Sequence, residues 1–196
     1  MARETRETKE RILDAAEEIM LTKSFCSVGL NEILNSVNVP KGSFYHWFSS
    51  KEQFGVELLR HYMNEHTARL KRILLSSDLN PLARIETMYD GMISRMLDGE
   101  CKQFCLVSKL GSEVSTFSEP MREVLADGMR EWRGIFEKVI REGQEQGVIR
   151  KDIDPAEAAA FVQDAWQGAM NRTQIERTVA PLRSAAAFII RSLAVS

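Results

Sequence analysis

The sequence predicts an all-α protein, and three observations lead to that prediction. Apolar residues recur at spacings of three and four along most of the chain, as they do on the buried face of a helix. No segment carries the composition and alternation of a strand. Proline or glycine stands at several boundaries of the periodic segments, where proline favours a helix start and glycine a helix end. Together these features divide the chain into nine helices.

The nine expected helices are joined by short connections. They cover about residues 5–23, 30–37, 40–48, 51–75, 81–98, 103–114, 119–146, 155–177 and 181–193. Ser27 and Ser118 are expected to cap the helices that follow them, because a side-chain oxygen can accept a hydrogen bond from an N–H without a helical partner. Gly147 is expected to end the seventh helix.

Composition narrows the class of protein. The chain has 196 residues, 44% of them hydrophobic, which suffices for one domain or two small ones. No apolar run reaches the roughly 20 residues of a membrane span, and the charged start MARETRETKER is unlike a signal peptide. A cytoplasmic protein without a membrane partner is therefore expected. Its three cysteines, an odd number, are expected to be free thiols.

The segment from Leu30 to Glu52 predicts a helix-turn-helix. Its first helix has apolar residues on one face, and Asn38-Val39-Pro40 interrupts that pattern before a second short helix begins at position 40 or 41. The net charge of −2 argues weakly against a nucleic-acid protein, but no acidic residue lies between Lys41 and Lys51. An uncompensated positive helix of this kind attracts a DNA backbone.

Residue type suggests roles within the second short helix. Lys41 and Ser43 can reach base edges in a major groove, and Gly42 allows close approach of the backbone. The three bulky aromatic residues are expected to pack inward: Phe44, Trp47 and Phe48. The alternative is a helix pair with a solvated basic end.

This block resembles the signature of TetR-type transcriptional regulators. The matching residues are Val39, Lys41, Gly42, Ser43, Tyr45, His46, Phe48, Ser50, Lys51 and Glu52. The resemblance implies a nine-helix TetR-type fold, with a DNA-binding domain over residues 1–50 (motif about 30–48) and a helical effector-binding and dimerisation domain over 51–196. It also implies phosphate contacts by Tyr45, His46 and Lys51, and a double-stranded operator DNA as partner.

The last two helices carry more small and apolar surface than one buried face requires. Alanines such as Ala169 and Ala186 would permit close approach of a second copy, giving a homodimer through a two-fold four-helix bundle. Alternatively, both helices complete the core of the monomer. A dimer would hold its two recognition helices about 34–36 Å apart, matching successive major grooves of a palindromic operator.

The cysteines differ in their expected roles. Cys101 and Cys105 lie four residues apart, but no further ligands accompany them, so no metal site is expected. Cys26 is expected to be a small buried core residue. Cys105 stands near a helix start with Lys109 one turn later, and both features favour the thiolate form and thus reactivity.

The segment CLVSKLGSEVS (residues 105–115), together with SFYHWF and SKEQFGV, resembles one branch of the TetR-type regulators. That branch contains the repressor of N-ethylmaleimide reductase and the acrylate-responsive repressors. The resemblance implies that a small electrophile or oxidant, such as a quinone, an aldehyde or hypochlorous acid, is sensed at Cys105. Cys101 is a possible resolving partner.

The expected function is therefore a transcriptional repressor that a small effector releases from DNA. Common phosphate-loop, hydrolase and metalloprotease motifs are absent, so neither an enzyme nor a cofactor is expected. An effector pocket is expected around Met92, Met96, Phe104, Trp132 and Trp166. Two alternatives remain: a repressor that binds an apolar ligand without cysteine chemistry, and a DNA-binding factor without ligand control.

Overall fold

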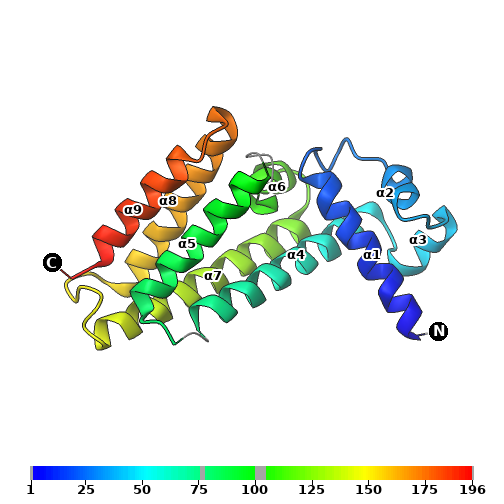
Figure 1. Ribbon diagram of the computed structural model, residues 1–196. Helices are drawn as coiled ribbons and strands as arrows, with labels where there is room; N and C mark the ends of the chain where they lie inside the picture. Colours follow the sequence, from blue (N-terminus) through cyan, green and yellow to red (C-terminus); the bar gives the residue numbers. More distant parts are fainter. Residues whose placement is uncertain (1, 76–77, 100–104, 196) are drawn as a thin grey trace. The chain divides into compact units, whose positions relative to one another are not determined.

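The computed structural model describes residues 2–75, 78–99 and 105–195, and their side chains from residue 7 onward. These residues form nine α-helices (Figure 1), so the predicted all-α, nine-helix architecture is confirmed. The helices are α1 (Ala2–Met20), α2 (Leu30–Ser36), α3 (Lys41–Trp47), α4 (Lys51–Leu74), α5 (Pro81–Asp98), α6 (Leu106–Val114), α7 (Glu119–Glu145), α8 (Pro155–Glu176) and α9 (Ala180–Leu193). Within the described residues, extended pairing is limited to one antiparallel bridge between Ile149 and Ala194.

Several helix ends follow the expected capping chemistry. The Asn80 side chain accepts a hydrogen bond from the Ala83 N–H at 3.0 Å, and the Ser118 hydroxyl accepts one from Met121 at 3.4 Å. Gly147 follows α7 with a φ of 72°, a left-handed conformation that glycine adopts without strain.

The cap predicted for Ser27 is wrong. Gly29 is the residue that precedes α2, and no side chain caps this helix. The Ser27 hydroxyl instead donates to the Ser24 carbonyl at 3.0 Å, while the Ser27 N–H donates to the Ser24 hydroxyl at 3.3 Å. A local turn thus engages the serine, as this residue type often does outside helices.

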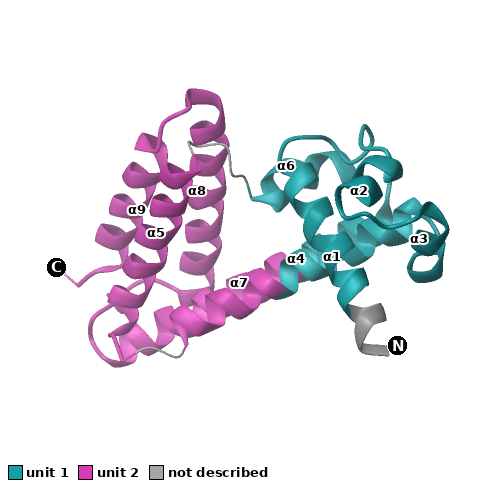
Figure 2. Cartoon of the chain, turned by 45° about the vertical axis from the view of Figure 1, so that its right-hand side comes forward, with its two compact units in different colours: residues 1–64, 105–127 teal, residues 65–104, 128–196 magenta. Residues whose placement is uncertain are grey.

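The chain forms two compact units, coloured separately in Figure 2. Unit 1 comprises residues 1–64 and 105–127, and unit 2 comprises residues 65–104 and 128–196. Two of the three boundaries fall inside α4 and α7, so each of these helices contributes to both units. The functional division at residue 50 stays a prediction.

In unit 1, α1 packs against α2, as expected for a helix that supports a helix-turn-helix. Arg11 of α1 fixes the end of α2 by donating to the Val37 carbonyl at 2.8 Å. Phe44, Phe48 and Phe54 are fully buried, and their ring centroids lie 4.9–5.4 Å apart. This cluster joins α3 to the first turns of α4.

In unit 2, α9 contacts both α5 and α8. A buried Arg84 on α5 donates to the carbonyls of Leu74 at 2.9 Å and Leu79 at 2.7 Å. Its guanidinium also binds both carboxylate oxygens of Glu142 on α7, at 2.9 and 2.6 Å. Among the described residues, no helix is long and apolar enough to cross a membrane.

Candidate functional site

The predicted recognition helix α3 presents its polar residues to solvent. Lys41, Gly42, Tyr45 and His46 are exposed, and Ser43 is half-buried. A Cβ at Gly42 would meet no protein atom within 4 Å, so packing within the chain does not require glycine there. The helix therefore offers a charged and hydroxyl-bearing surface.

The opposite side of α3 anchors it to the protein. Phe44 and Phe48 are buried and Trp47 is half-buried, in agreement with their predicted packing role. The turn before α3 contains Asn38 with a φ of 55°, a left-handed conformation that asparagine tolerates better than most residues. This turn redirects the chain between α2 and α3.

Lys51 is engaged within the protein. Its ammonium donates to the carbonyls of Val28 at 2.8 Å and Cys26 at 3.3 Å, and lies 5.2 Å from the centre of the Phe25 ring. In this conformation Lys51 holds the connection between α1 and α2. Its contact with a DNA phosphate stays a prediction.

Cys105 directly precedes α6 and is half-buried. The buried Tyr62 hydroxyl donates to Cys105 Sγ at 3.3 Å and accepts a hydrogen bond from the Leu106 N–H at 3.2 Å. Burial, followed by the neighbouring Cys105, raises the pKa of Tyr62 well above its usual value, so the phenol keeps its proton. The α6 start and the thiol thus share one partner on α4.

Lys109, the predicted companion of Cys105, lies one turn along α6. Its N–H donates to the Cys105 carbonyl at 3.1 Å. Burial lowers the pKa of Lys109 and the nearby Glu113 carboxylate opposes that shift. Its proposed effect on the thiol stays a prediction.

The other cysteines differ from Cys105. The burial predicted for Cys26 is wrong, because the residue is exposed in the connection between α1 and α2. Glu113, which binds this segment, raises the pKa of the Cys26 thiol, and this disfavours the reactive thiolate. Cys101 lies outside the described residues, as does the pocket residue Phe104.

The four described members of the predicted pocket lie in unit 2. Met96 and Trp132 are buried, whereas Met92 and Trp166 are half-buried. Trp132 donates from its indole N–H to Thr67 at 2.8 Å, and Trp166 lies 4.4 Å from Tyr89 between ring centroids.

The sequence prediction of this pocket omitted three polar residues that contact its members: His66, Thr67 and Tyr89. Thr67 binds Trp132, and the His66 ring centroid lies 5.6 Å from that of Trp132. Burial, then Arg69 and Arg95, lower the pKa of His66 to about 4, so this imidazole is neutral at pH 7. The Tyr89 hydroxyl is buried and has no hydrogen-bond partner among the described residues. Helical spacing identifies all three as facing inward but not which aromatic ring each one meets.

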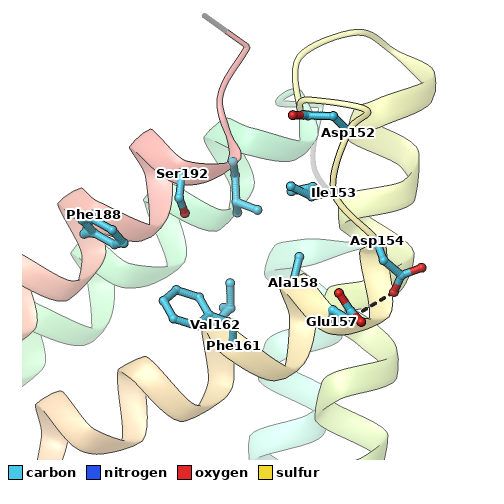
Figure 3. Close-up of a pocket in the computed structure, with 10 residues that line it drawn as sticks. Asp152, Ile153, Asp154, Glu157, Ala158, Phe161, Val162, Phe188 and Ser192 are labelled. Atoms are coloured by element: carbon cyan, nitrogen blue, oxygen red, sulfur yellow. Dashed lines mark hydrogen bonds between the residues drawn. The ribbon is translucent and has the colours of Figure 1, made fainter.

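A hollow of about 440 Å³ lies beside α8 and α9 in unit 2. Figure 3 shows Phe161 of α8 and Phe188 of α9 near one end of it, with Asp152, Ile153 and Asp154 at the other. Phe161 and Phe188 are 51% and 56% exposed.

The alanines expected at a partner surface occupy a different place. Ala169 and Ala186 are both buried within a single chain. The expectation that they lie at the surface is therefore wrong, because they pack inside unit 2, in which α8 and α9 contact each other.

Comparison with known proteins identifies the class that this helix-turn-helix architecture represents. The family model described as "Bacterial regulatory proteins, tetR family" matches residues 12–58, and that described as "Tetracyclin repressor-like, C-terminal domain" matches residues 81–189. The HTH-type transcriptional repressor NemR of Escherichia coli K12 is 34% identical over 184 residues, covering 93% of this chain and 92% of NemR.

Solved structures agree with this assignment. Regulatory protein TetR from Rhodobacter sphaeroides superposes with a TM-score of 0.88 at 31% identity, covering 94% of this chain and 97% of that chain. The reduced form of E. coli NemR gives a TM-score of 0.85 at 33% identity, covering 96% and 98%. The chain belongs to the TetR family of bacterial transcriptional regulators. The predicted class, a DNA-binding TetR-type repressor with a helix-turn-helix, is confirmed.

Proposed function

We propose that this protein represses transcription by binding a palindromic operator as a homodimer, and that a small electrophile or oxidant reacting at Cys105 releases it. The observation that carries the DNA-binding part is the exposed set Lys41, Gly42, Tyr45 and His46 on a helix whose other side is anchored by buried aromatic rings. Rigid support is what allows a short helix to present side chains to base edges in a fixed register.

The DNA contacts predict two different mutant behaviours. Lys41→Ala should weaken operator binding about 10- to 100-fold and relax base preference, because a base contact is worth about 1–3 kcal/mol. Tyr45→Phe should weaken binding to operator and unrelated DNA alike, since a phosphate contact carries no sequence information. Fluorescence anisotropy with both DNAs over a range of salt concentrations measures these effects.

The control for both variants is Lys151→Ala, which removes an exposed positive charge in unit 2. It should leave the affinity within about twofold, because surface charges away from a contact contribute little. Unchanged operator affinity in Lys41→Ala would refute the assigned contact. Lys51→Ala is a poor probe, because this ammonium also holds the Cys26 and Val28 carbonyls.

The proposed dimer uses the outer faces of α8 and α9. Phe161, Gly168 and Ile175 are all exposed and recur every seven residues, which places them on one face of α8. Ile175 is 82% exposed, and Phe188 adds a second aromatic ring from α9. Apolar residues repeating at this spacing form the seam along which a second helix pair packs.

The proposed sensing step is addition of the Cys105 thiol to an electrophile. With N-ethylmaleimide, the sulfur forms a bond to one alkene carbon and the thiol proton is delivered to the other. Cys105 is half-buried and directly precedes α6, so an adduct there would disturb the hydrogen bonds of Tyr62 to the sulfur and to Leu106. The structure of the relative NemR is described as its reduced form, and this supports a role for the oxidation state of a thiol in the present chain as well.

Treatment with N-ethylmaleimide should release operator DNA from the wild type but not from Cys105→Ser. Cys26→Ser is the matched control and should still respond, because Glu113 raises the pKa of the Cys26 thiol and so disfavours reaction there. Lys109→Met should react more slowly, since it removes a positive charge while keeping the side chain's length. Mobility shifts with mass spectrometry of the adduct provide the measurement.

Release of Cys105→Ser by the same treatment would contradict the cysteine mechanism. It would favour the alternative, an apolar ligand held without covalent chemistry in unit 2. The buried Tyr89 hydroxyl lies beside the Trp166 ring and has no partner in the part of the chain that the structure describes. It supports that alternative by offering one hydrogen bond to such a ligand.

A further inference from the structure

Two charged side chains hold the connection between α1 and α2, one by its backbone N–H groups and the other by its carbonyls. The Glu113 carboxylate of α6 accepts hydrogen bonds from the N–H groups of Phe25 at 3.1 Å and Cys26 at 2.9 Å. The Lys51 ammonium of α4 donates to the carbonyls of Cys26 and Val28. We call these contacts, all within unit 1, the backbone clamp.

Glu113 is stabilised by its hydrogen bonds to the connection between α1 and α2, and not by its place in α6. Glu113 is the penultimate residue of α6, where the partial negative charge of a helix end disfavours a carboxylate. Its two N–H partners lie outside the helix and precede α2, the first helix of the DNA-binding motif. Hydrogen bonds to a charged acceptor are stronger than neutral ones, and here they offset the unfavourable location.

The clamped segment is also fixed by side-chain packing. Phe25 is buried, its ring is stacked on Phe117 with centroids 6.1 Å apart, and the Lys51 ammonium lies over it. A displacement of Glu113 therefore moves a segment that is firmly attached to the start of α2. A loosely held loop would absorb the displacement instead.

The other end of α6 carries the candidate sensor. The helix follows Cys105 directly, and its first N–H, that of Leu106, is bound by Tyr62. Glu113 lies seven positions after Leu106, about 10 Å along the helix, and both residues belong to the one continuous element α6. A displacement of the first turn of α6, beside Tyr62, should therefore also displace Glu113, because no loop lies between them.

We infer that Glu113 is a positioning residue that couples α6 to the DNA-binding helices through the backbone N–H groups of Phe25 and Cys26. In the state that binds DNA, Glu113 holds the connection before α2 in place. A shift of α6 lengthens these hydrogen bonds and lowers operator affinity. The inference deepens the proposed function, because it names the route by which a change at Cys105 reaches the DNA-binding surface.

A double-mutant cycle tests this coupling without any effector. Tyr62→Phe removes the hydroxyl that binds the first turn of α6, and Glu113→Ala removes the clamp at the far end. The two sites are about 10 Å apart along α6, so independent effects on operator affinity should multiply. We expect instead that Tyr62→Phe weakens binding at least about threefold more in the presence of Glu113 than in Glu113→Ala. Glu113→Gln, which retains one accepting oxygen, should give an intermediate result.

Hydrogen exchange at the Phe25 and Cys26 amides supplies a second readout. It should accelerate in Tyr62→Phe as well as in the Glu113 variants, whereas a purely structural role of Glu113 predicts no effect of Tyr62 on these amides. Glu123→Ala, which removes an exposed carboxylate from α7, should change neither quantity. Multiplicative affinities would overturn the inference, and so would unchanged amide exchange in Tyr62→Phe.

The cycle separates this inference from the proposed electrophile sensing. Suppose that N-ethylmaleimide does not release the wild-type protein from DNA, but the effects of Tyr62→Phe and Glu113→Ala on operator affinity are coupled. The sensing proposal is then wrong, and Glu113 keeps its positioning role. Suppose instead that N-ethylmaleimide releases the wild-type protein from DNA, but the two substitutions act independently on operator affinity. The change at Cys105 then reaches the DNA-binding helices by another route, and the role of Glu113 is refuted.

Discussion

Arg84→Met is expected to lower the free energy of unfolding by about 3 kcal/mol, because it removes a buried cation that four hydrogen bonds hold. The guanidinium satisfies the carbonyls of Leu74 and Leu79 and both oxygens of Glu142. Methionine fills much of the same volume but can donate to none of them. Urea denaturation monitored by circular dichroism measures the change.

The control for this variant is Arg141→Met, which breaks an exposed ion pair with Glu137 on the surface of α7. Its effect should stay within about 0.5 kcal/mol, as is usual for exposed pairs. Equal losses of unfolding free energy in the two variants would show that the buried Arg84 contributes no more to stability than an exposed arginine.

The ion pair between Arg84 and Glu142 should make the stability of the fold depend on pH in the acid range. Hydrogen bonding to Arg84 is the largest cause that lowers the pKa of Glu142 below its ordinary value of 4.5. A carboxyl with a lowered folded-state pKa contributes stability above its unfolded-state pKa and loses it as pH falls through the folded-state pKa. The stability difference between wild type and Arg84→Met should therefore be full near neutral pH and shrink below about 4.5.

Phe188→Glu and Ile175→Glu are expected to convert the proposed dimer into monomers and to reduce operator affinity at least about 100-fold. Two linked recognition helices bind with an affinity that exceeds that of one by about 10²–10⁴. Both side chains are exposed in the single chain, so a carboxylate there should leave the fold intact. Light scattering after size exclusion, combined with mobility shifts, measures both outcomes.

Leu97→Glu is the matched control, because Leu97 is a similarly exposed apolar residue of unit 2 on α5. It should remain dimeric and bind operator normally. Dimeric Phe188→Glu and Ile175→Glu proteins would place the subunit contact elsewhere. Ala169→Glu cannot make this distinction, since the buried alanine would report on the core of its own chain.

The helices and the recognition surface were predictable because local rules determine them. Helical periodicity and proline or glycine at the boundaries located the nine helices, and α5 begins and ends where the pattern indicates. Phe44 and Phe48 faced inward as their spacing required, leaving Lys41 and Tyr45 outside. Such features depend on residues a few positions apart, which one sequence displays directly.

Apart from the local turn at Ser27, the errors concern choices that depend on distant residues. The exposed Cys26 lies in a connection that Glu113 of α6 and Lys51 of α4 both bind, from positions 87 and 25 residues away along the chain. Likewise, Ala169 and Ala186 lie on helices with apolar residues on more than one face, so spacing alone does not tell the inner face from the outer one. Only the packed structure assigns these partners.

The single phenol that serves both Cys105 and Leu106 has a consequence for chemical selectivity. Oxidation of the sulfur adds compact oxygen atoms that still accept a hydrogen bond from Tyr62, so the helix start can keep its partner. A bulky alkyl group on the sulfur would instead compete with the Tyr62 phenol for space and is expected to separate the phenol from Leu106. Under the proposed sensing mechanism, reagents attacking the same atom are therefore expected to be graded by size, with small oxidants giving partial release of DNA and large alkylating agents complete release.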